Sequence, residues 1–160
     1  MKRSSKGFSL IELLIVVAII LIIAAIAIPN LLRSRIAANQ ASAVGSLRTL
    51  NTAEITYSST FNVGFTQTLA YLQPTAAGAN PTSTAAGLID SVLSGGSKSG
   101  YSFTYSPGAS DSTGRINTYS FTAVPITSST GTNYYFTDQS GVIRQNSTTT
   151  AASTDSPIAG

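Results

Sequence analysis

The sequence of 160 residues contains no cysteine and no histidine. Without cysteine it forms no disulfide and offers no thiol nucleophile, and without histidine it lacks the most common general base and metal ligand. Charged residues make up 9% of the chain, where roughly a quarter is usual in globular proteins. We therefore predict that the protein is not an enzyme and that it has no cofactor and no metal site.

The few residues that remain for catalysis or metal binding are scattered. A hydrolase without histidine or cysteine needs a serine beside a lysine, or two paired carboxylates. Beyond residue 30 the only lysine, Lys98, lies in a stretch rich in glycine and serine. Asp138 and Asp155 are seventeen residues apart, which is a weak pattern for a calcium site.

The basic charge of the chain is concentrated at its start. The sequence pI is about 9.4, but Lys2, Arg3 and Lys6 supply three of the nine basic residues, and without them six bases face six acids. No basic patch with interleaved aromatic residues follows in the sequence. The charge therefore indicates a targeting segment, and the sequence gives no sign of a nucleic-acid partner.

An uninterrupted apolar run follows these cations. The sixteen residues from Leu13 to Ile28 are all leucine, isoleucine, valine or alanine. As a helix, residues 8–28 would span about 31 Å, close to the thickness of the hydrocarbon core of a bilayer. Since basic residues tend to stay on the cytoplasmic side, we expect residues 30–160 to be exported.

Two simpler interpretations of the run stay open. Ala25-Ile26-Ala27 fits the cleavage site of an ordinary secretory signal peptide, and an uncleaved membrane anchor is also possible. Against a signal peptide, the run is longer than usual, Glu12 stands at its start, and the helical pattern continues beyond Pro29.

The sequence around Glu12 resembles a known family. Residues 7–20 read Gly-Phe-Ser-Leu-Ile-Glu-Leu-Leu-Ile-Val-Val-Ala-Ile-Ile, and residues 24–29 end the run in Ala-Ala-Ile-Ala-Ile-Pro. This stretch closely resembles the start of type IV prepilins and of the pseudopilins of type II secretion systems. The resemblance implies a leader, residues 1–7, that a prepilin peptidase removes by cutting between Gly7 and Phe8. It also implies N-methylation of Phe8 by the same enzyme.

Glu12 has no charged partner in the run, and a charge at the centre of a membrane helix costs roughly 2.5 to 3.5 kcal/mol. Cleavage would create an amine on Phe8, one helical turn away. The resemblance implies that Glu12 pairs with this amine on a neighbouring subunit and sets the axial register of a filament. The alternative is a glutamate that merely reaches the membrane surface.

The run departs from the family at one position. Many relatives have a glycine in the middle of the run, where this chain has Leu21. Pro29 is present, and because it has no N–H and opposes the carbonyl of Ala25, we predict a helix kink or a local opening near residues 25–29.

The helical pattern continues after Pro29 as an amphipathic helix. An apolar stripe recurs every seven residues, and helix breaks are expected at Ser58-Ser59 and around Asn62 to Gly64. We expect Phe61 and Phe65 to lie beyond the helix and, with Tyr57, to pack in the core. The stripe comprises Ile36, Ala43, Leu50 and Tyr57, flanked by Val44 and Leu47. Off this stripe, Arg33 and Arg35 stand just beyond the membrane, where they would meet lipid headgroups or a neighbour's acid.

The rest of the chain indicates a small mixed domain. Residues 88–93, closed by Gly95-Gly96, have the spacing of a short helix. Alternating aromatic residues predict strands at 101–105 and 119–123, and residues 134–144 predict a hairpin. The expected fold is α+β and pilin-like: a long N-terminal helix packed on a small antiparallel sheet of three or four strands.

The expected organisation has five parts in chain order. They are a leader (1–7), a hydrophobic transmembrane and polymerisation helix (8–29), an amphipathic helix (30–60), a globular head (61–145) and a loose tail (146–160). The expected function is that of a major pilin in a surface filament for adhesion, motility or DNA uptake. The alternatives are a type II secretion pseudopilin and a membrane-anchored binding module.

The expected partners follow from the resemblance. They are identical subunits in a helical homopolymer, the prepilin peptidase and N-methyltransferase, the assembly machinery of the inner membrane, and membrane lipid before assembly. The precursor would lie in a bacterial inner membrane with its N-terminus in the cytoplasm, and the assembled filament would be extracellular.

Overall fold

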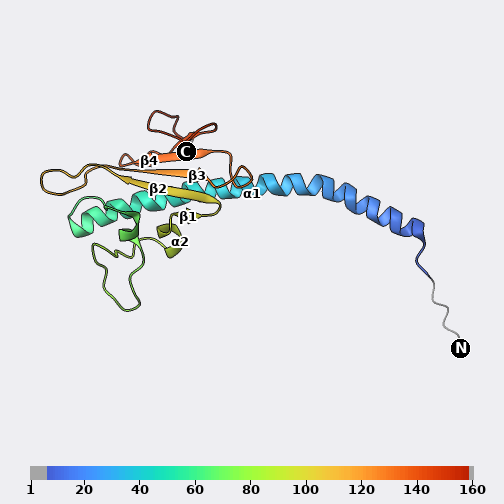
Figure 1. The fold of residues 1–160 in the computed structure, drawn as a ribbon, viewed down its shortest axis with the longest axis horizontal. Coiled ribbons are helices and arrows are strands. Elements are labelled where there is room, and N and C mark those ends of the chain that lie inside the picture. The colour runs from blue at the N-terminus through green and yellow to red at the C-terminus, as the bar shows by residue number, and fades with distance from the viewer. Residues whose placement is uncertain (1–6, 159–160) are drawn as a thin grey trace. The chain divides into compact units, whose positions relative to one another are not determined.

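The computed structural model describes residues 7–158, so most of the predicted leader and the last two residues of the tail lie outside the described part. The chain divides into one unit up to Arg35 and a second unit from Ile36 onward. Figure 1 shows the elements in chain order. They are α1 (Leu10–Phe61), η1 (Leu69–Leu72), α2 (Ser91–Ser94), β1 (Ser97–Lys98), β2 (Tyr101–Pro107), β3 (Tyr119–Pro125), β4 (Tyr134–Asp138) and β5 (Arg144–Asn146).

The long helix α1 continues further than the sequence indicates. It runs for 52 residues and ends at Phe61, so the break predicted at Ser58-Ser59 and the placement of Phe61 beyond the helix are wrong. The hydroxyl of Ser59 donates to the carbonyl of Thr56 at 3.0 Å, which lets the serine stay helical. The helix stops where Asn62 adopts a positive φ of 54°.

The sheet is antiparallel throughout and its strands lie in chain order, β1-β2-β3-β4-β5. The predicted strands are confirmed: β2 pairs with β3 over seven residues, with Tyr105 opposite Phe121. The predicted hairpin is confirmed as well, with Phe136 opposite Arg144. The additional strand is β1, a two-residue edge strand in the stretch rich in glycine and serine, where Lys98 pairs with Tyr101. The α+β fold is as expected, with five strands instead of three or four.

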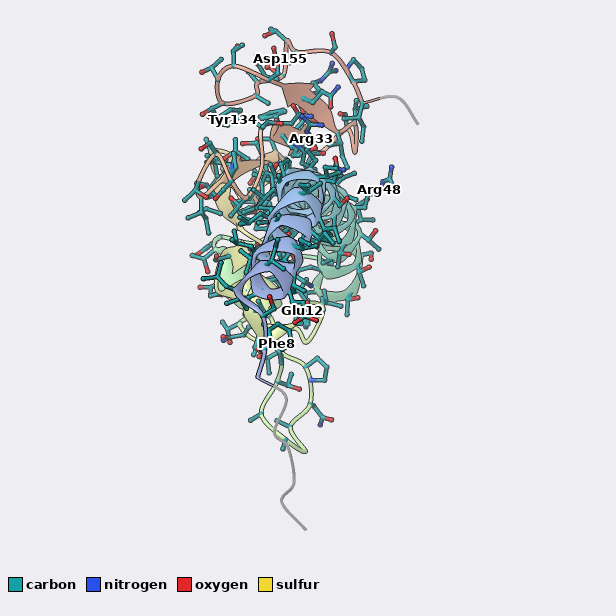
Figure 2. All side chains as sticks on the ribbon, turned by 90° about the vertical axis from the view of Figure 1, so that its right-hand side faces the viewer. Phe8, Glu12, Arg33, Arg48, Tyr134 and Asp155 are labelled. Carbon is teal, nitrogen blue, oxygen red and sulfur yellow. The ribbon has the colours of Figure 1, made fainter. Side chains whose placement is uncertain are left out.

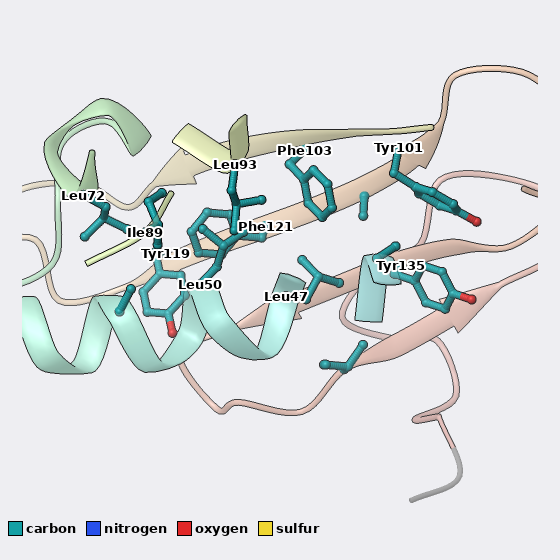
Figure 3. Close-up of a cluster of buried hydrophobic side chains, with 14 of the residues drawn as sticks. Leu47, Leu50, Leu72, Ile89, Leu93, Tyr101, Phe103, Tyr119, Phe121 and Tyr135 are labelled. Atoms are coloured by element: carbon teal, nitrogen blue, oxygen red, sulfur yellow. The ribbon is translucent and has the colours of Figure 1, made fainter. Parts of the chain in front are cut away.

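The C-terminal half of α1 lies against the sheet and supplies one side of the core (Figure 3). Ala43, Leu47 and Leu50 are fully buried, and Tyr57 is 3% exposed, which confirms the predicted stripe. The sheet supplies the other side through alternate residues of β2, β3 and β4. The residues are Tyr101, Phe103, Tyr119, Phe121, Ala123 and Tyr135.

The three aromatic residues at and beyond the end of α1 pack in this head, as predicted. The ring centroids of Tyr57 and Phe61 are 5.0 Å apart. Phe65 meets Tyr119 of β3 edge to face, with centroids 4.6 Å apart. Such contacts indicate that these rings serve to pack the core of the head.

The short helix α2 is smaller than the sequence indicates. The helical spacing predicts a helix over 88–93, but Leu88 and Ile89 are not helical. Their backbone N–H groups donate to the carbonyl of Leu72 at 3.0 and 3.1 Å. The helix begins only after Asp90, whose carboxylate accepts from the N–H of Leu93 at 2.8 Å as an N-cap.

The last described residues have no helix or strand, but they fold back along β5. The N–H of Ile158 donates to the carbonyl of Ile143 at 2.9 Å, and the N–H of Gln145 donates to Ser156 at 3.0 Å. The Asp155 side chain accepts from Asn146 at 3.0 Å. Residues 151–158 are therefore attached to the head, which differs from the loose tail expected from composition.

A matched pair of substitutions on α1 tests the packing. Replacing the fully buried Leu47 with alanine should lower the free energy of unfolding of the head by about 2 to 5 kcal/mol, because it leaves a cavity between helix and sheet. Ile55 is 59% exposed, so Ile55→Ala should have little effect. Urea unfolding of the full chain in detergent, followed by the near-ultraviolet circular dichroism of its tyrosines, measures both. Equal losses in the two variants would contradict this packing.

Candidate functional site

The predicted cleavage site precedes the first turn of α1. Gly7 and Phe8 are not helical, and the Phe8 side chain is 75% exposed. A Cβ atom added to Gly7 would meet nothing within 4 Å, so the folded chain itself leaves this position open. The backbone between the two residues is therefore accessible in the way that a peptidase requires.

Glu12 lies in the first turn of α1, close to Phe8 (Figure 2). Its Oε2 accepts a hydrogen bond from the backbone N–H of Ser9 at 3.0 Å, while Oγ of Ser9 accepts from the N–H of Ile11 at 3.4 Å. A serine followed three residues later by a glutamate is the capping-box pattern, which satisfies free N–H groups at a helix start. Glu12 thus has a partner inside the chain that was not predicted, although the spacing of Ser9 and Glu12 is visible in the sequence.

The second carboxylate oxygen of Glu12 makes no hydrogen bond within residues 7–158. The side chain is also exposed, and the part of the chain that the structure describes offers it no ion pair. Among residues 7–158, Glu12 therefore uses one oxygen to cap its own helix and has no donor for the other.

The apolar run after Glu12 is helical and uncovered. Within residues 10–32 every large hydrophobic side chain is between 45% and 76% exposed, from Val17 to Leu10. By length and composition this part of α1 could cross a membrane. The helix also continues through Pro29 without the local opening near residues 25–29 that was one of the predicted alternatives. A bend at Pro29 stays a prediction.

Comparison with known proteins supports the N-terminal resemblance. Residues 2–28 match the family model described as the prokaryotic N-terminal methylation motif. A segment of 37 residues is 68% identical to the type IV wide pilus major component PilA4 of Thermus thermophilus, covering 23% of this chain and 28% of that protein. A segment of 50 residues is 52% identical to the type IV major pilin protein PilA of Myxococcus xanthus, covering 31% of this chain and 23% of that protein.

The chain is similar to type IV major pilins over part of its length. The matches span less than a third of this chain and of each relative, so most of each protein lies outside them. No solved structure matches the chain. Both relatives are named as major components of type IV pili.

The head of the chain contains a second glutamate, Glu54, that is completely buried. Its Oε2 accepts from the backbone N–H of Thr66 at 3.0 Å, and its Oε1 accepts from the Thr66 hydroxyl at 2.5 Å. Both bonds tie the end of α1 to the segment that follows it. Tyr105 of β2 donates from its hydroxyl to the carbonyl of Thr66 at 2.6 Å, which joins the sheet to the same point.

A neighbouring pair of hydrogen bonds joins α1 to the next strands. The side-chain amide of Asn51 donates to the hydroxyl of Thr137 on β4 at 2.8 Å. The hydroxyl of Tyr119 on β3 donates to the side-chain carbonyl of Asn51 at 3.1 Å. Since apolar contacts alone have little direction, these polar bonds fix how α1 is placed along the sheet.

Burial raises the pKa of two groups in this network, Glu54 and Tyr105. Loss of solvent raises the pKa of Glu54 above its ordinary value of 4.5, and the hydrogen bonds from Thr66 oppose that rise. Burial, followed by the nearby Glu54 carboxylate, also raises the pKa of Tyr105. The burial of Glu54 was not predicted, although Leu47, Glu54 and Phe61 share a seven-residue spacing that indicates one helix face.

The residues weighed for a metal or a catalytic group have other partners. The amine of Lys98 forms an ion pair with Asp90 at 2.9 Å. Asp138 accepts from the N–H of Ser140 at 2.9 Å, whereas Asp155 accepts from Asn146 and Ala152. Within residues 7–158 no three acidic side chains are grouped as metal ligands, so the geometry assigns these acids to turns.

Glu54→Gln tests the buried carboxyl of the head. Because the native state raises the pKa of Glu54, it binds the proton more tightly than the unfolded chain does. Stability is therefore fully present below about pH 4.5 and falls as pH rises through the native pKa. Glutamine does not titrate, and it can accept from the Thr66 N–H while donating to the Thr66 hydroxyl. The variant should be more stable than the wild type at neutral pH and independent of pH from about pH 5 to pH 8.

Urea unfolding at several pH values measures this difference. The chain has no histidine, so few other groups titrate in that range. Asp90→Asn is the matched control: a hydrogen bond from Lys98 lowers the pKa of Asp90, so that variant should differ from the wild type in pH dependence only below about pH 4. A Glu54→Gln variant that keeps the pH slope of the wild type would overturn this assignment.

Proposed function

We propose that the protein is a structural subunit, a major pilin that polymerises through its N-terminal helix into a type IV pilus. The observation that carries the proposal is Glu12, which is exposed at the start of an uncovered apolar helix. One of its carboxylate oxygens accepts no hydrogen bond from residues 7–158. The N-terminal similarity to the major pilus components of Thermus thermophilus and Myxococcus xanthus supports it. The surface filament would serve adhesion, motility or DNA uptake.

Processing comes first in the proposed sequence of events. A prepilin peptidase cuts between Gly7 and Phe8 at the accessible segment before α1, which removes the leader and leaves an amine on Phe8. The same enzyme methylates this amine. Before assembly the apolar part of α1 lies in the inner membrane, with the N-terminus in the cytoplasm and the head outside.

Assembly then pairs Glu12 with the Phe8 amine of a neighbouring subunit. Two unit charges about 4 Å apart attract by roughly 4 kcal/mol at an effective dielectric constant near 20. This is comparable to the cost of placing Glu12 in apolar surroundings, so a correctly placed neighbour is favoured over a misplaced one. The pairing would thereby set the axial register of the filament.

Processing can be measured on sheared filaments. Cells are sheared, and the mass of the N-terminal peptide of the released fibre is determined. We expect a peptide that starts at Phe8 and carries one added methyl group. A processed subunit that stays in the cell envelope would indicate a type II secretion pseudopilin instead, and retention of residues 1–7 would overturn both functions and favour a membrane-anchored binding module.

Two substitutions separate the charge of Glu12 from its capping bond. The side-chain oxygen of glutamine can still accept from the Ser9 N–H, so Glu12→Gln should keep the helix start while losing the charge. Glu12→Ala loses both. We expect both variants to be inserted into the membrane and neither to form filaments, as measured by membrane fractionation and by electron microscopy of sheared material. Normal filaments from Glu12→Gln would contradict the charge-pairing role.

A further inference from the structure

Two arginines follow the apolar run directly and have no acidic partner within residues 7–158. Arg33 and Arg35 are exposed, and neither donates a hydrogen bond to any side chain or backbone group within residues 7–158. Over the same range the ion pair of the chain joins Lys98 to Asp90. The two guanidinium groups are therefore available to a ligand from outside the chain.

Their position along the helix matches one face of a bilayer. Arg33 follows Glu12 by 21 residues, which corresponds to about 31 Å of helix, and the hydrocarbon core of a bilayer is about 30 Å thick. The side chains between these two residues are apolar except for Asn30. When Glu12 lies at one edge of the hydrocarbon core, Arg33 lies at the opposite edge, at the level of the lipid headgroups.

Their position around the helix distinguishes lipid from a neighbouring subunit. Residues two apart on a helix are separated by roughly 200°, so Arg33 and Arg35 point to opposite sides of α1. A single carboxylate on a docked subunit approaches from one side and could meet one of them. A layer of lipid phosphates surrounds the helix and meets both.

The chemistry of the side chain agrees with a phosphate ligand. The planar guanidinium group can donate two parallel hydrogen bonds to a phosphate, and it stays charged in any medium. The flexible stem of each arginine can follow the apolar surface while its charged end stays in the headgroup layer.

We propose that Arg33 and Arg35 bind lipid phosphates on opposite sides of α1 and so fix the depth of the anchor in the membrane. This inference rests on the membrane-inserted precursor of the proposed function, but not on filament assembly. Arg33 and Arg35 lie outside the N-terminal motif. The ligand assigned to them is the phosphodiester group of a membrane lipid.

Solid-state nuclear magnetic resonance can detect the contact directly. The full chain, with ¹³C in the guanidinium carbon of arginine, is reconstituted in bilayers of phosphatidylcholine and phosphatidylglycerol. Dipolar dephasing of the arginine signal by ³¹P is then measured. The parent chain carries Arg3→Gln, so that no arginine of the leader adds to the signal. We expect clear dephasing in this parent, a partial loss when Arg33→Gln or Arg35→Gln is added, and an almost complete loss when both are added.

Arg48 provides the matched control. It is an exposed arginine on the same helix, but it belongs to the unit that forms the head, where it lies beside Thr49 and Thr52. Arg48→Gln should leave the dephasing unchanged. Glutamine is a good helix former, so none of these exposed substitutions should disturb α1.

Other outcomes overturn the proposal in distinguishable ways. Hydrogen exchange of the amides in residues 13–28 reports in the same samples whether the helix is inserted. If the helix is inserted but Arg33 and Arg35 show no dephasing, lipid binding is overturned and the proposed function stays intact. A guanidinium contact with a carboxylate of a neighbouring chain would have the same consequence. A helix that exchanges freely with water overturns both the membrane precursor and the lipid contact.

Discussion

The structure depends on how two carboxylates find partners in a chain with very few cations. A charge in apolar surroundings costs several kcal/mol unless hydrogen bonds or an opposite charge compensate it. Glu54 is compensated inside the head, where Thr66 donates to both of its oxygens. Glu12 is compensated only in part, since the Ser9 N–H occupies one oxygen. The hydrogen bonds of Glu54 complete the fold of the head. Glu12 keeps a carboxylate oxygen to which a partner can donate a hydrogen bond.

The same scarcity of charge shapes the rest of the head. Where many domains use ion pairs, this one joins helix to sheet by neutral hydrogen bonds, through Asn51, Thr137 and Tyr119. Such bonds are hardly affected by salt, unlike bonds between exposed charges. Their directional geometry fixes the placement of α1 on the sheet. A head whose surface is repeated along a filament would also avoid repulsion between like charges of neighbouring subunits.

The sequence predicted the features that depend on local pattern. Alternating aromatic residues marked β2 and β3, and the motif around Glu12 marked the N-terminal region. What it missed depends on contacts between distant residues. The helical spacing at Leu88 was overridden because the backbone of that segment binds the carbonyl of Leu72. Glu54 was missed because an acid normally indicates surface, and its partner Thr66 lies twelve residues further along the chain.

The uncovered N-terminal half of α1 separates folding from assembly. Its apolar side chains do not contribute to the core of the head, so the head gains no stability from them. They need an apolar environment, which either lipid tails or the helices of neighbouring subunits can supply. Because both environments are apolar, moving from one to the other changes the hydrophobic free energy little. On the proposed function, the polar groups at the two ends of this segment would then determine which environment is favoured. The Glu12 carboxylate would gain a cation in the filament, while Arg33 and Arg35 would favour the headgroup layer. An anchor that is held by phosphates until a neighbour's amine meets Glu12 would leave the membrane only at a growing filament.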